Sequence, residues 1–427
     1  MKKKENSNKT IDRYSELASE SPNNNEMLKQ VQYDGKNKTI KISLLLLVIF
    51  IFCGCEKNNS TNPSEEFDFS MCDASIRINS LDNISEILPN TCLMFGDKIT
   101  HIPDSFCIKY LTSATEDDEI ILAGIYSEAV ATVGYWAFYG SKLKQVYLSN
   151  ATTIEASAFG HNHITKLYLP NVTTIESYAF INNQLTTLSL PSAITIGMYA
   201  FTNNQLTTAS LPNATTIGIL TFGNNQLTTV SSPKAITIEN WAFMDNQLTT
   251  VSLPNATTIG TEAFLNNQLT TVYLPNVTTI GNYAFGNNQI TALSLPNATT
   301  IGLFAFENSE IDTLDLSKGD TIKYGAFNNN KLTKVYIPNI KYIEGYVFAR
   351  NPDLKEVHTY TDPMLLELND ISANAFQDIF YENKNTITVY IKNANWKEAM
   401  EEKWKDYDGG KDAWGNDKSK VTVKVLE

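Results

Sequence analysis

Residues 263–283 read A-F-L-N-N-Q-L-T-T-V-Y-L-P-N-V-T-T-I-G-N-Y, and variants of this unit follow one another through most of the chain. The phenylalanine of the unit, Phe264, recurs at a constant interval of 21 residues. Its positions are Phe138, Phe159, Phe180, Phe201, Phe222, Phe243, Phe264, Phe285, Phe306, Phe327 and Phe348. A constant period of about 20–50 residues indicates a repeat architecture. The sequence therefore predicts one array of stacked units instead of several globular domains.

The L-x-x-V-x-L segment of each unit has the alternation of a β-strand. Val272 and Leu274 fall on one face, and Thr271 and Tyr273 fall on the other. Pro275 ends the strand because proline lacks the amide hydrogen that a sheet requires. A single unit cannot bury its own apolar face, so neighbouring units must stack about 4.8 Å apart. We therefore predict a solenoid in which the recurring phenylalanines form a buried column.

Asparagine and glycine mark the turns of each unit. An asparagine three residues after the phenylalanine is predicted to satisfy backbone groups of the loop, and Ser141 and Ser309 replace it in two units. These asparagines are Asn162, Asn183, Asn204, Asn225, Asn246, Asn267, Asn288, Asn330 and Asn351. Glycines after the T-T-I segment are predicted to form tight corners with a positive φ. They are Gly134, Gly197, Gly218, Gly260, Gly281 and Gly302.

The N-terminal region carries a targeting signal. A basic stretch leads into an apolar run over residues 42–52, which is shorter than the roughly 20 residues of a membrane-spanning helix. Cys53, Gly54 and Cys55 follow, and this arrangement resembles the lipobox of bacterial lipoproteins. The resemblance implies cleavage before Cys55, lipidation of that residue, and a lipid-anchored protein of the bacterial cell envelope, at the outer membrane or cell surface. An uncleaved membrane anchor is the alternative.

These features divide the chain into four parts. Residues 1–54 form the signal peptide, with Met27 as a possible true start, and residues 55–100 form a polar tether and an N-terminal cap. Residues 101–360 form the solenoid, and residues 361–427 form the last repeat and a C-terminal cap.

Three cysteines follow the tether, at Cys72, Cys92 and Cys107. In an exported protein one pair of them is expected to form a disulfide with one thiol left over. Three reduced and buried thiols are the alternative, and the sequence leaves the choice open.

The succession of a strand, L-P, an I-G corner, A-F and then asparagine resembles the BspA-like, or Treponema-type, leucine-rich repeats over about residues 120–376. The resemblance implies a solenoid of 21-residue units, each a β-strand plus a turn or short helix. It further implies one curved parallel sheet and a small α+β C-terminal cap. For function, it implies a bacterial surface or secreted protein that binds host or bacterial macromolecules, often as an adhesin, without a catalytic site.

Composition points the same way. The 427 residues carry 33 Lys and Arg against 46 Asp and Glu, for a net charge of −13. This balance argues against nucleic acid as a partner, because phosphate binding requires a basic face. Four histidines and five cysteines leave few groups for metal-dependent or nucleophilic chemistry. We therefore predict no enzyme, no cofactor and no metal site.

Candidate binding residues lie on the solvent-facing side of the strands. This side carries Thr and Ser in the middle of the array, with Tyr and charged residues at both ends. Tyrosine supplies a large, rigid contact area and is enriched at binding hot spots. The candidates are Tyr147, Tyr168, Tyr273 and Tyr336, with the first two expected on neighbouring strands. Alternatively, these tyrosines only reflect strand propensity.

A second aromatic row stands two residues before the phenylalanines and is expected to pack as an outer wall. It contains Trp136, Tyr178, Tyr199, Trp241, Tyr283, Phe304 and Tyr346.

The leading hypothesis is a lipid-anchored surface solenoid that binds an extracellular macromolecule, foremost a host matrix protein. The alternative is a structural protein that self-associates or binds glycans or another periodic surface through its Thr and Ser array.

Overall fold

The computed structural model describes the solenoid and parts of its two ends. The described residues are 67–81, 90–107, 122–360, 379–380, 382–383, 385–393, 396–397, 401 and 421–426. The predicted signal peptide, the lipidation site Cys55 and most of the predicted tether lie outside them. Within the described part, no helical segment has the length and apolarity that crossing a bilayer requires.

The chain forms a solenoid whose turns each contribute one strand to a front sheet. All neighbouring front strands that share hydrogen bonds run parallel. They are β1 (Ala74–Ile78), β2 (Thr91–Phe95), β4 (Leu122–Ser127), β6 (Gln145–Leu148), β8 (Lys166–Tyr168), β10 (Thr187–Ser189), β12 (Thr208–Ser210), β14 (Thr229–Ser231), β16 (Thr250–Ser252), β18 (Thr271–Tyr273), β20 (Ala292–Ser294), β22 (Thr313–Asp315), β24 (Lys334–Tyr336), β26 (Glu356–His358), β27 (Ile387–Ile391) and β28 (Val421–Val425).

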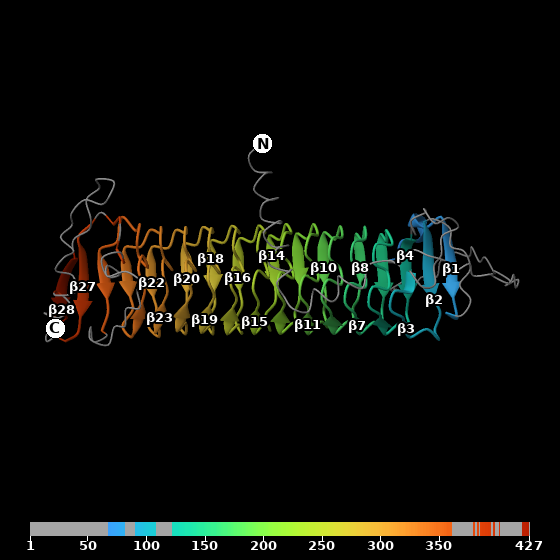
Figure 1. Cartoon of the computed structure of the whole chain (residues 1–427), viewed down its shortest axis with the longest axis horizontal. Helices are drawn as coiled ribbons and strands as arrows, with labels where there is room; N and C mark the ends of the chain where they lie inside the picture. The colour runs from blue at the N-terminus through green and yellow to red at the C-terminus, as the bar shows by residue number, and fades with distance from the viewer. Residues whose placement is uncertain are drawn as a thin grey trace, which may run out of the picture. The chain divides into compact units, whose positions relative to one another are not determined.

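A second, 12-stranded parallel sheet forms the back of the solenoid, and the two sheets lie along opposite sides of it (Figure 1). Its two-residue strands are β3 (His101–Ile102), β5 (Thr132–Val133), β7 (Thr153–Ile154), β9 (Thr174–Ile175), β11 (Thr195–Ile196), β13 (Thr216–Ile217), β15 (Thr237–Ile238), β17 (Thr258–Ile259), β19 (Thr279–Ile280), β21 (Thr300–Ile301), β23 (Thr321–Ile322) and β25 (Tyr342–Ile343).

The predicted solenoid of 21-residue units is therefore confirmed, but it has two sheets instead of one. The T-T-I segment, which precedes the predicted glycine corner and was not predicted to be a strand, pairs in register with its copies in the neighbouring turns, as in Thr195 with Thr216 and Ile196 with Ile217. Threonine and isoleucine are β-branched and favour extended backbone. Between residues 122 and 360 the connections are turns, without helix.

The recurring phenylalanines form one buried column. Phe243 stacks between Phe222, at a ring-centroid distance of 5.4 Å, and Phe264, at 5.2 Å. All three side chains are 0% exposed. The prediction of a buried phenylalanine column is confirmed.

A column of buried asparagines runs beside the phenylalanines. Asn246 Nδ2 donates to the carbonyl oxygens of Phe222 at 2.9 Å, Phe243 at 3.2 Å and Met244 at 3.2 Å. Its Oδ1 accepts the amide hydrogen of Leu227, at 2.9 Å. Each asparagine thus ties its own turn to the preceding one, which confirms the predicted role of these side chains.

Ser309 interrupts this column and provides a test of its strength. The Ser309 hydroxyl is buried and has no hydrogen-bond partner within the described residues. We expect Ser309→Asn to raise the free energy of unfolding by about 1–3 kcal/mol, because an amide would engage backbone groups that serine cannot reach. Urea unfolding checks this, with Ser252→Asn at an exposed front position as the control. Equal stabilities of the two variants would refute the expectation.

The glycines of the T-T-I-G segment do not have the positive φ that was predicted. Positive φ values occur two residues after the position that this glycine occupies in the unit, for example at Tyr178 (61°) and Tyr283 (53°). They occur again two residues after each phenylalanine of the column, as at Asn266 (56°). Glycine is needed at position 281 for another reason. A Cβ atom there would lie 2.5 Å from the amide nitrogen of Thr261 in the preceding turn.

The second aromatic row packs along the turns as an outer wall, as expected. Tyr178 and Tyr199 stack with ring centroids 4.9 Å apart, and Tyr283 and Phe304 stack at 5.1 Å. Most of the side chains in this row are half-buried, and in the two stacked pairs each ring covers part of the other.

The predicted pairing of the cysteines is resolved. Cys72 and Cys92 form a disulfide, and Cys107 is a buried free thiol. Burial raises the pKa of Cys107 to about 12, although its contact with the Ser141 hydroxyl acts in the opposite direction. At the other end, β27 and β28 lie within the region predicted to form the last repeat and the C-terminal cap, and they continue the parallel front sheet.

Candidate functional site

The exposed face of the front sheet changes character along the solenoid. In β10, β12, β14 and β16 the first and third residues are Thr and Ser, and they are exposed. Pairing in register places like residues side by side, as in Thr208 between Thr187 and Thr229. From β22 onward the same two positions carry Asp315, Lys334, Tyr336 and further charged and aromatic side chains. Charged and aromatic side chains on this face are therefore concentrated toward its ends, whereas its middle carries mainly Thr and Ser.

At the N-terminal end, the predicted binding residue Tyr147 is not exposed. Its side chain is 1% exposed and stacks between Tyr126, at 4.8 Å, and Tyr168, at 4.5 Å. Phe67 packs on this group, with its ring edge-on to Tyr126 at 5.5 Å. Tyr168 is half-buried. The expectation that Tyr147 presents a free contact surface is wrong, because an N-terminal segment covers it.

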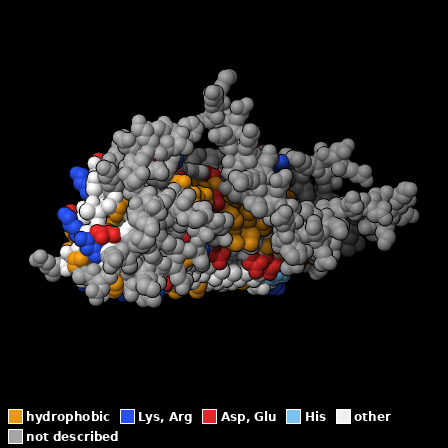
Figure 2. Space-filling view, turned by 60° about the vertical axis from the view of Figure 1, so that its left-hand side comes forward, with side chains coloured by type: hydrophobic (Ala, Val, Ile, Leu, Met, Phe, Trp, Pro, Cys, Tyr) orange, Lys and Arg blue, Asp and Glu red, His pale blue; other side chains and the backbone are white. Residues whose placement is uncertain are grey.

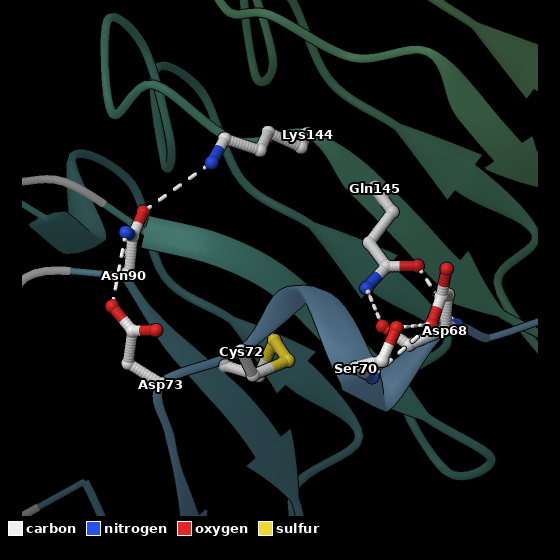
Figure 3. The surroundings of a disulfide bond; sticks show 8 residues. Asp68, Ser70, Cys72, Asp73, Asn90, Lys144 and Gln145 are labelled. Carbon is white, nitrogen blue, oxygen red and sulfur yellow. Dashed lines mark hydrogen bonds between the residues drawn. A yellow bond between two sulfur atoms is a disulfide. The ribbon is translucent and has the colours of Figure 1, made fainter.

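This covering segment, residues 67–72, contains a short 3-10 helix, Phe69–Met71. Figure 3 shows it lying across the front strands, next to the disulfide. The Asp68 amide donates to Gln145 Oε1 at 3.0 Å, and Gln145 Nε2 donates to the Asp68 carbonyl oxygen at 2.7 Å. The Asp68 carboxylate pairs with Lys166 at 3.2 Å. The covering segment lies within residues 55–100, which were predicted to form a tether and an N-terminal cap, and these contacts place it against the solenoid.

The pKa of Asp68 is lowered, first by the hydrogen bond from the Ser70 hydroxyl and then by the one from Lys166. Asp68 therefore keeps its negative charge, and its pairing with Lys166, further into the acid range than an ordinary aspartate.

The hydrogen-bonded ladder of the front sheet is interrupted three times, after β8, β14 and β20, whereas the back sheet is continuous. At each interruption the central apolar residue of the last strand is partly exposed: Leu167, Val230 and Leu293. The equivalent residues inside the ladders are closed off, as with Val272 at 1% exposure. The front sheet thus opens at three places, which lie three turns apart.

The third interruption forms a shallow depression, which we call the notch. It is lined by Leu293, Thr313, Leu314, Asp315, Lys334 and Tyr336. Leu293 and Leu314 are apolar, and the other four side chains bring hydroxyl groups and charges of both signs. Tyr273, which is 48% exposed, stands on β18, the strand before β20. Two of the four predicted binding residues, Tyr273 and Tyr336, therefore lie at or next to one site.

Charges around the notch are partly paired. Lys334 Nζ lies 3.2 Å from a carboxylate oxygen of Glu356, and His358 Nε2 lies 3.4 Å from the same oxygen. The pKa of Glu356 is lowered, chiefly by the contact with His358 and then by Lys334. The Asp315 carboxylate accepts a hydrogen bond from the Ser317 hydroxyl and forms no ion pair within the described part of the chain.

Aromatic side chains continue beyond the notch toward the C-terminal end. Tyr336 packs edge-on to Tyr360 at 5.7 Å, and His358 stacks on Tyr390 at 4.5 Å. Lys392 Nζ lies 4.2 Å from the centre of the Tyr360 ring. Figure 2, which turns the C-terminal side forward, shows blue and red side chains lying among uncharged ones where described residues are visible.

The charged residues of the notch were predictable from the sequence, but its exposed apolar residue was not. Asp315 and Lys334 stand at solvent-facing strand positions, where the charge at the end of the array was visible in the repeat pattern. Nothing in the sequence indicated that Leu293 is partly exposed, because the repeat pattern assigns its position in the unit to the core. None of the groups of His, Cys, Asp and Glu among the described residues has an arrangement that could hold a metal ion.

Comparisons with known proteins agree with the repeat pattern. The model of the BspA type leucine rich repeat region matches residues 123–207, 194–311 and 278–395. Comparison with curated proteins found no match.

Comparison with solved structures found several to which this chain is similar. A leucine rich cell surface protein from Faecalibacterium prausnitzii is 17% identical, with 74% of this chain and 95% of that chain covered and a TM-score of 0.34. The pneumococcal vaccine antigen PcpA is 16% identical, with 84% and 91% covered and a TM-score of 0.40. A leucine-rich repeat protein from Eubacterium ventriosum is 20% identical, with 55% and 72% covered and a TM-score of 0.31.

Proposed function

This chain belongs to the family of proteins with BspA-type leucine-rich repeats, and from that premise we propose that it is a bacterial surface protein that binds an extracellular macromolecule through its front sheet. A host matrix protein is the partner that we propose first. The observation that carries the proposal is the notch, where an opening in the front sheet lies next to two tyrosines and to charges of both signs. The proposed role is binding without catalysis.

Two features support this assignment. Aromatic side chains with one polar end are favoured at protein interfaces, and Tyr273 is among the most exposed large hydrophobic side chains of the described residues. The lipobox-like sequence around Cys55 would place the solenoid outside the cytoplasm, where an extracellular partner can reach it.

The test measures binding of the purified chain to immobilised host matrix proteins and glycans by surface plasmon resonance. We expect the double variant Tyr273→Ala/Tyr336→Ala to bind its partner at least about thirtyfold more weakly, since one hot-spot side chain alone contributes about 2 kcal/mol or more. The matched control is Tyr139→Ala/Tyr324→Ala, which removes two tyrosines of 37% and 38% exposure from the turns. Equal losses in the two double variants would refute the assignment of the site.

A second candidate function is self-association, and one observation favours it. The in-register Thr and Ser side chains of β10, β12 and β14 make a regular, uncharged face that a second copy could match. Sedimentation velocity over a range of concentrations tests this candidate. Binding to no matrix protein or glycan, together with a mass that rises with concentration, would favour it over the first.

A further inference from the structure

We infer that the notch receives a basic side chain, an arginine first and a lysine second, from an extended segment of a protein partner. This inference rests on the proposed function and specifies the chemistry of its partner. It follows from three neighbouring features of the notch: an apolar floor, an unpaired carboxylate and an aromatic ring.

The apolar floor exists because the front sheet is open at this point. Leu293 is partly exposed, although the equivalent Val272 is 1% exposed. Leu314 also lines the depression. Arginine and lysine have long aliphatic stems that cover apolar surface while their charged ends stay in water. A stem lying over this floor would remove the exposed part of Leu293 from water, whereas Leu314 is already buried at 4% exposure.

The charged end of such a side chain has a partner in Asp315. This carboxylate is exposed and forms no ion pair within the described residues. The one cation of the notch, Lys334, lies 3.2 Å from Glu356, so its charge is already compensated. An incoming acidic group would meet Asp315 and a lysine that is already paired, whereas an incoming basic group meets an available carboxylate.

The aromatic ring lies beside that carboxylate. Asp315 on β22 and Tyr336 on β24 are direct partners in the parallel register, so their Cα atoms are about 4.8 Å apart. A cation within about 6 Å of a tyrosine ring centre is attracted to the ring face. One guanidinium group can therefore contact the carboxylate and the ring together, and its planar, weakly hydrated form favours arginine over lysine.

The test uses capped hexapeptides that are identical except for a central Arg, Lys, Gln or Glu, with binding to the full chain measured by fluorescence anisotropy. We expect the affinities to follow the order Arg, Lys, Gln, Glu, and the affinity for the Arg peptide to fall as salt is raised. Asp315→Asn should weaken binding of the Arg peptide about fivefold and leave the Gln peptide unchanged.

Two controls keep the assignment specific. Asp312→Asn makes the same change at an exposed residue of the same turn, outside the notch, and should have no effect. Tyr336→Phe keeps the ring and should bind like the unchanged protein, whereas Tyr336→Leu should bind more weakly. Circular dichroism spectra identical to that of the unchanged protein show that each variant is folded.

The inference is overturned if no peptide binds, if the Gln or Glu peptide binds as well as the Arg peptide, or if Asp312→Asn weakens binding as much as Asp315→Asn. Its failure differs from failure of the proposed function. If Tyr273→Ala/Tyr336→Ala abolishes binding of a matrix protein while Asp315→Asn changes nothing, the surface binds its partner without a basic anchor.

Discussion

Replacement of Phe243 by alanine is expected to lower the free energy of unfolding by about 3–5 kcal/mol. The ring is 0% exposed and is stacked on both sides, at 5.4 Å and 5.2 Å, so its loss leaves a cavity in the middle of a continuous column. The neighbouring rings cannot close this cavity, because each is held by its own turn.

Urea unfolding combined with hydrogen exchange measures this effect. In a solenoid each turn contacts only its neighbours, so the loss of amide protection should be greatest in the turns of Phe222, Phe243 and Phe264. The control is Tyr283→Ala, which removes an aromatic ring of 36% exposure from the outer wall. If the two variants lose the same stability, the phenylalanine column is not the main source of cohesion between turns.

The Asn246→Ala variant is expected to lose at least about 2 kcal/mol. Asn246 is 7% exposed, and its amide group contacts three carbonyl oxygens and one backbone N–H. Each buried backbone group left without a partner costs about 1–3 kcal/mol, and alanine replaces none of these bonds.

The same measurements apply, with Asn255→Ala as the matched control. Asn255 is exposed and donates one hydrogen bond, to the Pro233 carbonyl oxygen at 2.7 Å. Its loss should cost less than about 1 kcal/mol, because water replaces the bond. A cost for Asn246→Ala no larger than this would mean that the buried asparagines align the turns without stabilising them.

The phenylalanine column also matters for the proposed binding surface. The notch residues stand on β20, β22 and β24, in the turns whose rings Phe285, Phe306 and Phe327 stack in that column. The asparagine column, by contrast, is interrupted by Ser309 in the turn of β22. A rigid support lets exposed side chains bind without a large ordering cost. The outer surface can then vary from turn to turn while the core repeats.

The features that depend on one unit and its neighbour were predictable from the sequence. Phe264, Asn267 and Val272 recur with the same spacing, and each must meet its own copies when the units stack, so their burial and contacts follow from the period. The second sheet was missed because a two-residue strand such as β11 is too short to show alternation. The glycine prediction failed because close approach between turns, and not a positive φ, excludes a side chain at position 281.

The features that depend on distant parts of the chain came only with the three-dimensional structure. Tyr147 occupies a position of the repeat unit that the sequence pattern predicts to be exposed. It is buried because the segment around Asp68, which lies 77 residues before Gln145 in the chain, folds onto the sheet. Leu293 occupies the same position in its unit as the buried Leu188. It is partly exposed because the front ladder opens after β20 while the back sheet stays continuous. A repeated sequence specifies the contacts between one turn and the next, because identical neighbours meet in every turn. It does not specify where the ladder opens or what covers its ends, since those depend on the stacking of many turns and on segments that occur once.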